Sequence, residues 1–460
     1  MQYCKEIKKR KEYVLVVCGG GVTGVAAAVS AARHGIKTAL IEERGCLGGV
    51  ATGCGVHFLL GGRKYNPETG KMDRKIGGIF DELTDRLIAD GGALEPDDVD
   101  LSRNYFGWYP RMAAGIPLNN EKMKIMLENM CMEAGVDIHY FTRIVDTIRE
   151  ADRIKHILAH DKSGFFVLDA PLFIDATGDA DIAFQAGCAT LKGRASDGLT
   201  TPSSLEMILE HVNRDELVEY QNLHNSPKLV EIVKQLKARG EWPFIFDIIV
   251  SMQLTEPDVF LVNTVRQIRI DGTDGAHLTR GMIEGRRENM KLFELLKKHF
   301  PGFAASRIRY ISDFIGIRES RRIVGQYTVT VKDALEGRRF DDCIAGTTYN
   351  WDLPDPEKPS VDPMLGRGSH PDANMKQDVI RIPYRAMLPQ ELKNLIVTGR
   401  CISVDREVLG PARIMGPCMG MGHAAGLASV LASGNGWSYS TIDVRKLRHL
   451  LVEENSLLPE

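Results

Sequence analysis

Short apolar runs recur along the chain, and each gives way within a residue or two to glycine or an acidic residue. They cover residues 13–17, 37–41, 393–398 and a stretch that starts at residue 172. Runs of this length without polar alternation are typical of strands buried on both faces of a parallel sheet. Between the first two runs, small residues predict a helix that ends at His34. The pattern therefore predicts an α/β fold built on a parallel sheet.

The remaining periodic segments are of a different kind. Residues 135–150 form two strand-like runs, whereas residues 204–240 and 280–300 carry charged, amphipathic patterns that predict helices. Residues 307–333 are rich in β-branched side chains and predict paired strands. The five prolines of residues 351–371 predict a loop or lid there.

The first apolar strand runs into CGGGVTG, in which Gly19, Gly21 and Gly24 form Gly-x-Gly-x-x-Gly. The first glycine permits a tight turn, the second lets the backbone approach a pyrophosphate, and the third lets helix and strand pack closely. Glu42, at the end of the second strand, would accept hydrogen bonds from the adenosine ribose. This order of elements predicts a dinucleotide-binding fold rather than a chance glycine turn, and the helix N-terminus would face the phosphates. The predicted cofactor-binding residues of this loop are Gly19, Gly21, Val22, Thr23 and Gly24.

A second glycine pair, Gly48–Gly49, follows in ERGCLGGVATGCG. An NAD-binding domain has no general need for such a pair. The stretch resembles the loop after the second strand in FAD-dependent oxidoreductases of the glutathione-reductase structural superfamily. The alternative is a plain flexible turn. The resemblance implies FAD contacts from Glu42, Glu43, Gly48, Gly49, Ala51 and Thr52.

Two further stretches agree with FAD as the cofactor. LFIDATGDADIA, residues 172–183, resembles the ATG motif that many flavoproteins place beneath the adenosine half of FAD. By analogy, the adenine would pack near Ile144, and the strand at residues 393–398 ends at Gly399–Arg400. The implied contacts are Ile144, Ala176, Thr177, Gly178, Asp181, Gly399 and Arg400.

Residues 410–434, GPARIMGPCMGMGHAAGLASVLASG, contain a predicted helix from about Pro417 to Ser433. Gly416 suits the N-cap, Pro417 the first helical position, and Gly434 the C-terminus. By resemblance to flavoproteins, the N-terminus of this helix would point at the N1–C2=O edge of the flavin, with contacts from Pro417, Cys418 and Met419. The alternative is a close-packed core helix without cofactor contact.

Over almost its whole length the chain resembles the bacterial FAD-dependent oxidoreductase family, a glutathione-reductase- or fumarate-reductase-like group of flavoproteins. The resemblance is carried by CGGGVTG, LIEERGCLGGVAT, DATGDADIA, IGIRESRRIVGQY and NLIVTGRCIS through PCMGMGHAAG. It implies a Rossmann-like FAD domain of the GR2 type and an FAD-dependent oxidoreductase activity, but no substrate. We expect a discontinuous FAD-binding domain with an inserted α+β substrate or cap domain. The expected boundaries are 11–60, 119–189 and 386–460 for the FAD domain, 61–118 for a smaller excursion, and 190–385 for the cap.

Composition excludes several other classes. The net charge is −3 with acids and bases interleaved, which argues against nucleic acid as a partner. None of the nine cysteines forms a C-x-x-C pair, so no metal site is expected, and free thiols suit a reducing compartment. The charged N-terminus is no signal peptide, and no apolar stretch is long enough to cross a membrane. We therefore expect a cytoplasmic protein, whose oligomeric state the sequence leaves open.

The predicted catalytic candidates are Arg318, Arg322, Arg406 and His57. The clustered arginines of IGIRESRRIVG would bind an anionic substrate or the flavin side, or else form an ion-paired strand edge. Arg406 is placed in a loop before the glycine-dotted helix, at a position where the family pattern often has His. Because arginine cannot act as a base, Arg406 would bind a carboxylate or phosphate.

Four other residues are weaker candidates. Arg413 matches a family position. His423 favours a packed or capping role, and Cys54 lacks the second cysteine of a redox disulfide. Cys418, at a helix N-terminus, could have a lowered pKa, although a buried structural role is the default.

The favoured function is hydride transfer between flavin N5 and a small organic substrate. The alternatives are a flavoprotein with a redox-neutral lyase or isomerase reaction and an RNA-modifying flavoprotein. A non-catalytic nucleotide-binding module is the least favoured. No second Gly-x-Gly-x-x-Gly unit follows the first, so a dedicated NAD(P)H domain is not expected.

Overall fold

The centre of the protein is a five-stranded parallel sheet in the order β21-β12-β2-β3-β8. The computed structural model describes residues 7, 9–98, 115–357 and 376–460. The strands are β2 (Leu15–Cys18), β3 (Thr38–Ile41), β8 (Asp137–His139), β12 (Leu172–Asp175) and β21 (Leu395–Val397). The apolar runs predicted as parallel strands are therefore confirmed, and with them the α/β fold class.

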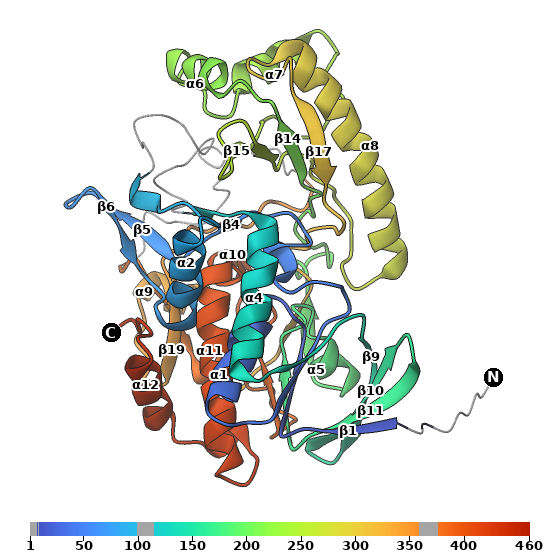
Figure 1. The fold of residues 1–460 in the computed structure, drawn as a ribbon, viewed down its shortest axis with the longest axis vertical. Helices are drawn as coiled ribbons and strands as arrows, with labels where there is room; N and C mark the ends of the chain where they lie inside the picture. The colour runs from blue at the N-terminus through green and yellow to red at the C-terminus, as the bar shows by residue number, and fades with distance from the viewer. Residues whose placement is uncertain (1–6, 8, 99–114, 358–375) are drawn as a thin grey trace.

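Helices cover one face of this sheet. They are α1 (Val22–Arg33), α2 (Gly78–Ala89), α4 (Asn120–Ala134) and α11 (Met415–Ser433). Leu15 and Val17 of β2 point into the apolar cluster that these helices share. Figure 1 shows α1 and α11 running side by side below the level of α10.

The other face of the parallel sheet packs against a second sheet in the order β1-β11-β10-β9. Val16 of β2 and Phe173 of β12 point to this side and pack with Ile157 and Phe166. The strands are β1 (Lys9–Glu12), β9 (Arg143–Glu150), β10 (Arg153–Asp161) and β11 (Gly164–Asp169). Because successive strand residues face opposite sides, β2 is buried on both faces, as its unbroken apolar pattern predicts.

A third sheet, β15-β16-β14-β17, is antiparallel and lies at the opposite end of the molecule with three helices (Figure 1). Its strands are β14 (Met207–Glu210), β15 (Ser251–Gln253), β16 (Phe260–Val262) and β17 (Arg307–Ile311). The helices are α6 (Arg214–Leu223), α7 (Val230–Ala238) and α8 (Gly275–His299). Together they enclose a separate apolar cluster. The predicted domain boundaries stay a prediction.

Two expectations for this region need correction. Residues 207–210 form β14 rather than part of a helix, because their apolar side chains pack inside the third sheet. The strands of residues 307–333 do not pair with each other: β17 pairs with β14, and β18 (Arg321–Ile323) pairs with β13 (Thr190–Lys192). The chain between β17 and β18 carries the backbone from the third sheet back towards the first.

The remaining elements are short. Strands β4 (Phe58–Leu59) and β7 (Ile116–Pro117), β5 (Arg63–Asn66) and β6 (Lys71–Arg74), and β19 (Cys343–Thr347) and β20 (Ile380–Pro383) form antiparallel pairs. The short helices are α5 (Asp181–Gln185), α9 (Val331–Glu336), α10 (Arg406–Ala412) and α12 (Val444–Glu453). Turns of 3-10 helix occur at Gly49–Ala51, Pro96–Asp98, Tyr384–Met387 and Tyr439–Thr441. The predicted proline-rich loop begins in irregular chain at 351–357, and its residues 358–371 lie outside the described residues.

Within the described residues, no single helix is long and apolar enough to cross a membrane; only α10 and α11 taken together pass on length and composition, and they meet at a bend of 90°.

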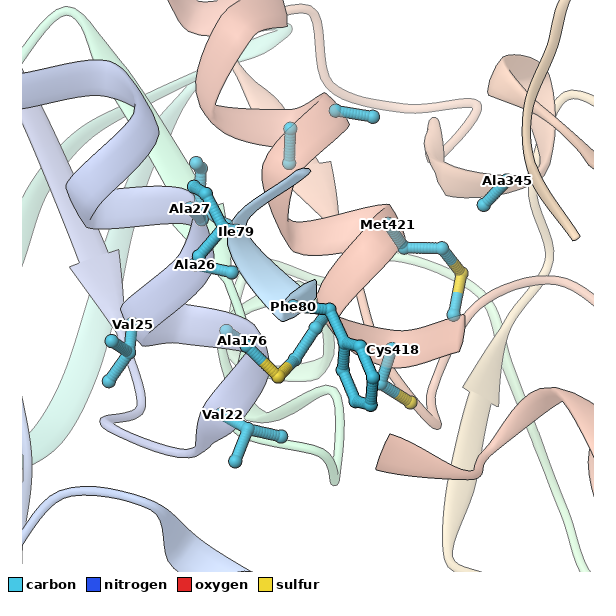
Figure 2. Close-up of a cluster of buried hydrophobic side chains, with 14 of the residues drawn as sticks. Val22, Val25, Ala26, Ala27, Ile79, Phe80, Ala176, Ala345, Cys418 and Met421 are labelled. Carbon is cyan, nitrogen blue, oxygen red and sulfur yellow. The ribbon is translucent and has the colours of Figure 1, made fainter. Parts of the chain in front are cut away.

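A close backbone contact in the core joins α1 to α11, and glycine makes it possible. A Cβ atom on Gly422 would lie 2.2 Å from the carbonyl oxygen of Thr23, and one on Gly426 would lie 2.4 Å from that of Ala27. Figure 2 shows Ala26 and Ala27 of α1 in the same cluster as Cys418 and Met421 of α11. The predicted small-residue stripe thus lets two backbones touch.

Replacing Gly422 with alanine should therefore separate the two helices. A backbone carbonyl cannot move aside as a side chain can, so we expect Gly422→Ala to lower the free energy of unfolding by about 2–3 kcal/mol. Gly420→Ala in the same helix is the control, because its Cβ would meet its nearest neighbour at 3.5 Å. That change should be neutral or stabilising by up to about 1 kcal/mol, since alanine favours helix. Urea denaturation of both variants measures the difference, and equal effects would contradict the packing argument.

A carboxylate also joins three helices near the C-terminus. Glu454 accepts a hydrogen bond from His423 of α11 at 2.6 Å and one from His34, the C-cap of α1, at 2.5 Å. Burial opposes the charge of Glu454, but these hydrogen bonds prevail and lower its pKa to about 2 from an ordinary 4.5. The ionised carboxylate therefore stabilises the fold.

This stabilisation should be lost in acid. Because the folded pKa lies below the unfolded one, the contribution of Glu454 is complete above pH 4.5 and disappears as the pH falls towards 2. We expect Glu454→Gln to cost about 1 kcal/mol at pH 7, allowing for partial exposure, and less at pH 3. The neighbouring Glu453→Gln serves as control in urea titrations at both pH values. A difference that grows in acid would contradict the assignment.

Candidate functional site

A cavity of about 1050 Å³ opens at the carboxyl ends of the central parallel strands. The residues that follow β2, β3, β12 and β21, namely Gly19, Glu42, Ala176 and Thr398, all line it. Ligands of open parallel sheets bind at this edge, because the loops there are free of the sheet's own hydrogen bonds. The cavity continues past this edge to residues of the third sheet and its connections. Its volume reaches the upper limit of roughly 1,000 Å³ for pockets that hold drug-sized ligands.

The glycine loop behaves as its pattern predicts. Gly19 has a φ of +104°, a left-handed conformation that favours glycine, and a Cβ on Gly24 would lie 1.9 Å from the carbonyl oxygen of Gly19. Gly21 is different, because a Cβ there would meet no atom within 4 Å. Since Gly21 lines the cavity, its missing side chain leaves space for a ligand at the N-terminus of α1.

The second glycine loop lies directly against the first. The N–H of Gly48 donates to the carbonyl oxygen of Gly20 at 2.9 Å, and a Cβ on Gly49 would lie 3.1 Å from the Cα of Gly21. Glu42 holds the two loops together. One of its carboxylate oxygens accepts a hydrogen bond from the N–H of Gly20 at 2.8 Å, and the other accepts one from the N–H of Arg44 at 2.9 Å. Burial raises the pKa of Glu42 despite these bonds. The two loops thus form one cradle of backbone at one end of the cavity.

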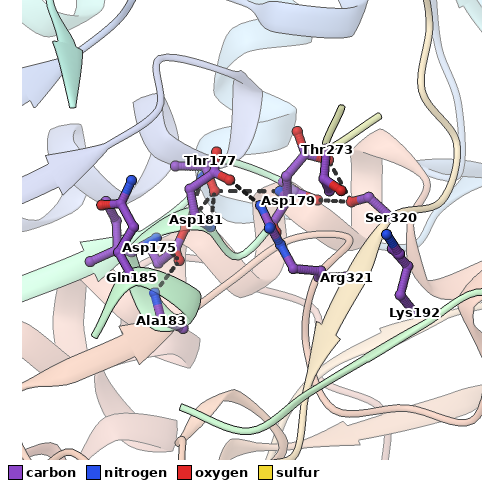
Figure 3. Close-up of polar contacts among 12 residues, drawn as sticks. Asp175, Thr177, Asp179, Asp181, Ala183, Gln185, Lys192, Thr273, Ser320 and Arg321 are labelled. Atoms are coloured by element: carbon purple, nitrogen blue, oxygen red, sulfur yellow. Dashed lines mark hydrogen bonds and ion pairs between the residues drawn. The ribbon is translucent and has the colours of Figure 1, made fainter. Parts of the chain in front are cut away.

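Asp175 organises the ATG loop (Figure 3). One oxygen of its buried carboxylate accepts from the N–H and hydroxyl of Thr177, and the other accepts the N–H groups of Ile182 and Ala183 at 3.0 and 3.1 Å. These bonds hold Ala180 in a left-handed conformation, with a φ of +53°. Asp175 was not among the predicted site residues, although an acid at the end of an apolar strand was a usable signal.

Arginines from two distant segments close this loop. Arg400 donates to Asp179 at 2.8 Å, and Arg321 donates to the carbonyl oxygen of Asp179 at 2.7 Å and pairs with Asp181. Asp181 lines the cavity, and burial together with Asp179 and Asp175 raises its pKa to about 7. The three motifs that contain these residues are therefore assembled into one wall.

The start of α11 also lines the cavity, but the helix begins earlier than predicted. The helix begins at Met415 with Ile414 as N-cap, two residues before the predicted start, so Pro417 is the third helical residue. Proline fits there because first-turn N–H groups have no intrahelical acceptor. The N–H of Gly416 donates to Leu60, whereas that of Met415 has no acceptor among the described residues. Ile414, Met415 and Cys418 line the cavity.

The far end of α11 also differs from the expectation. The helix ends at Ser433 with Gly434 as C-cap, as predicted, but Gly434 has a φ of −89°, and the left-handed residues are Gly436 and Trp437. Helix α12 follows α11 in the chain.

Most predicted cofactor contacts meet in the cavity. Those that line it are Gly19, Gly21, Val22, Thr23, Glu42, Glu43, Gly48, Gly49, Ile144, Ala176, Thr177, Gly178, Asp181, Gly399, Arg400 and Cys418. Gly24, Ala51, Thr52, Pro417 and Met419 are not part of its lining. Thr52 instead donates to the carbonyl oxygen of Leu47 at 2.6 Å, and Ala51 and Met419 are core residues.

Two of the predicted catalytic arginines are held by an internal carboxylate. Arg406 donates to both oxygens of the buried Glu319 at 2.9 Å, and Arg322 donates to the same group at 3.2 Å. Arg406 is the first residue of α10 and does not lie in a loop. Neither arginine lines the cavity. The ion pair of Arg322, on β18, matches the alternative of an ion-paired strand edge, and Arg406 joins the same carboxylate from α10, so we do not propose either as a substrate ligand.

Of the remaining predicted candidates, some line the cavity and others do not. Arg318 lines the cavity, but His57 does not; His57 forms a 2.7 Å hydrogen bond with Tyr310, and burial lowers its pKa to about 4. His423 is packed against Glu454 and Ser456. The lowered pKa suggested for Cys418 is wrong, because burial of the thiol raises its pKa to about 12.

Several cavity residues were missed by sequence reasoning. They are Arg44, Asp179, Glu206, Asn263, Arg266, Tyr349 and Asp352. Glu206 offered a signal, since it is a single acid within the apolar stretch SSLEMIL. Its carboxyl group is fully buried, and this burial raises its pKa to about 7. We call the part of the cavity that is lined from residues 204–318, residues 349–355 and Arg413 its cap-side end. Charged side chains line this end, whereas the cradle is formed by backbone.

The geometry of the cradle fits FAD. Its glycines leave space where a pyrophosphate would lie, an acid stands at the end of β3, and the cavity extends on to the start of α11. These features define a flavin- and dinucleotide-binding enzyme of the parallel-sheet class. A family model described as FAD dependent oxidoreductase matches residues 15–451. The chain therefore belongs to this family, and the protein is an FAD-dependent oxidoreductase.

Other comparisons add distant likenesses only. No curated protein matches the chain. Similar solved structures include a geranylgeranyl bacteriochlorophyll reductase-like protein from Thermoplasma acidophilum, with 15% identity over 97% of this chain and 84% of that chain and a TM-score of 0.47. The p-nitrophenol 4-monooxygenase PnpA from Pseudomonas putida DLL-E4 shows 11% identity over 97% and 82%, with a TM-score of 0.42. The myxobacterial chondrochloren halogenase CndH shows 12% identity over 96% and 78%, with a TM-score of 0.46. Likenesses this distant do not bear on the substrate.

Gly21 allows a test of the cradle that spares the fold. A valine side chain at this position would enter the cavity, because a Cβ there has no neighbour within 4 Å. We expect Gly21→Val to lower the affinity for FAD by at least about tenfold, since it displaces a phosphate from charge-assisted hydrogen bonds. The melting temperature without FAD should stay close to that of the wild type. Fluorescence titration of FAD measures the effect, with Gly434→Ala as a surface control; unchanged affinity would place FAD elsewhere.

Proposed function

We propose that this FAD-dependent oxidoreductase transfers a hydride between flavin N5 and a small organic substrate held at the cap-side end of the cavity. The observation that carries the proposal is the continuity of one cavity from the glycine cradle to the cap-side residues. Bound FAD supplies the hydride acceptor or donor, and the protein supplies position, charge and proton exchange. The finer placement of the chain in the glutathione-reductase superfamily stays a prediction.

The first turn of α11 supports this proposal through its position between the two ends of the cavity. Met415 and Cys418 line the cavity with Thr398 and Gly399 of the parallel-sheet edge. The N–H of Met415, which has no acceptor in the described part of the chain, and the helix dipole place partial positive charge there. Such charge favours a reduced, anionic flavin edge, as the family resemblance implies. Buried, high-pKa thiols at Cys418 and Cys54 do not favour thiol chemistry.

Glu206 is the group we propose for proton exchange with the substrate. One of its oxygens accepts from Ser204 at 2.8 Å, and the other has no hydrogen-bond partner among the described residues. With a pKa of about 7, its carboxyl group can both release and take up a proton near neutral pH. Oxidation of a substrate would need the charged form, so its rate should rise with pH through about 7.

The test is reduction of the flavin by a substrate without oxygen. The purified, FAD-loaded protein is mixed anaerobically with small organic acids, alcohols and amines while absorbance near the visible flavin band is followed. We expect at least one compound to bleach the band, and Glu206→Gln to keep its FAD while the pH dependence of bleaching disappears. Glu210→Gln, at the end of β14, is the matched control. If the protein converts a compound while its flavin stays oxidised throughout, a redox-neutral reaction is favoured instead.

A further inference from the structure

Three arginines from separate segments meet at the cap-side end of the cavity. Arg266 follows β16, Arg318 lies between β17 and β18, and Arg413 is the C-cap of α10. All three line the cavity, together with Glu206 and Asp352. Three guanidinium groups thus face two carboxyl groups.

Arg266 and Arg318 are held by neutral groups. Arg318 donates to the carbonyl oxygen of Pro202 at 2.9 Å and to the amide oxygen of Asn263 at 3.3 Å, and Arg266 donates to the same amide oxygen. Within the described chain, no carboxylate oxygen lies within 4.0 Å of either guanidinium, in contrast to Arg322 and Arg406. Sharing one amide oxygen orients two cations but does not neutralise them.

Burial makes this arrangement costly. It lowers the pKa of Arg318 to about 9, helped by repulsion from Arg266 and Arg413, and it lowers the pKa of Arg266 as well. The charges of Glu206 and Asp352 offset part of this effect, since both act to raise the pKa of Arg266 and Arg318. Arg413 is paired with Asp352, and its buried Nε has no partner among the described residues. Arg266 and Arg318 are half-buried and lack a close counterion, an arrangement that costs free energy, so this end of the cavity is suited to an anion.

The wall beside the arginines is apolar. It is lined by Phe246, Ile248, Val250, Met252, Leu278 and Met282. An occupant of this space therefore needs an apolar body next to its charged group.

We propose that the substrate is a small carboxylic acid with an apolar body, whose carboxylate is bound by Arg318 and Arg266. This inference rests on the proposed function and names the class of its substrate. The planar guanidinium fork matches a carboxylate, and an excess of one positive charge suits a monoanion better than a phosphate dianion. Held in this way, the substrate would present its apolar part towards the remaining length of the cavity.

The experiment compares acids with their neutral amides on the FAD-loaded protein. The probes are hexanoate, phenylacetate and 3-phenylpropionate, each beside its primary amide, with inorganic phosphate as a further ligand. Binding is followed by perturbation of the flavin spectrum and by thermal shift. We expect at least one acid to bind about tenfold or more tightly than its amide, as loss of a hydrogen-bonded charge pair predicts.

Variants separate a binding role from a structural one. Arg318→Gln and, independently, Arg266→Gln should weaken binding of the acid about tenfold or more and leave binding of the amide unchanged. Without ligand, their melting temperatures should equal or exceed that of the wild type, because a repelled cation has been removed. Arg307→Gln, at an exposed position of β17, is the control and should change neither.

Three results would overturn the proposal: equal binding of acid and amide, tighter binding of phosphate, or a lower melting temperature for Arg318→Gln and Arg266→Gln without ligand. The last would mean that the arginines serve the fold. Failure of the proposed function would look different, since the wild type would then lack flavin absorbance or show no reduction by any compound. A normal flavin spectrum reduced by an uncharged substrate would keep the function and refute the carboxylate.

Discussion

The close contact between α1 and α11 is the constraint on which the site depends. Two helices that start nearly 400 residues apart in the sequence can bring their N-termini to one cavity only if their backbones touch. Gly422 and Gly426 permit this, because any side chain would collide with the carbonyl oxygens of Thr23 and Ala27. Both helix N-termini then add partial positive charge to the same space. A cavity formed in this way is suited to a long, negatively charged cofactor.

The two ends of the cavity differ in whether their charged side chains have internal partners of opposite charge. At the cradle, two charged groups have internal partners: the carboxylate of Asp175 accepts hydrogen bonds within its own loop, and Arg400 pairs with Asp179. These bonds fix backbone N–H groups and loop shape without help from a ligand. At the cap-side end, Arg266 and Arg318 share only the neutral oxygen of Asn263. The cradle is therefore complete as a binding surface, whereas the cap-side end holds charge that a ligand can neutralise.

The sequence predicted what depends on local chemistry and missed what depends on distant partners. The strand, Gly-x-Gly-x-x-Gly, helix and acid around Gly21 and Glu42 could be placed because each turn requires particular residues at fixed spacing. The start of α11 was misplaced because the N–H of Gly416 is satisfied by Leu60, which is distant in the sequence. The sequence could not distinguish Arg318 from Arg406, because only the fold places Glu319 beside Arg406. Glu206 was missed because its relation to the cavity depends on the third sheet.

The central claim is that one FAD molecule lies between the glycine cradle and the first turn of α11. A crystal structure of the protein grown with excess FAD tests it most directly. The account predicts adenosine density beside Glu42, pyrophosphate density against Gly21, and isoalloxazine density adjoining Met415 and Cys418. Clear FAD density at another site would contradict the account. So would FAD bound in the reverse direction, with its isoalloxazine ring beside Glu42 and its adenosine beside Met415.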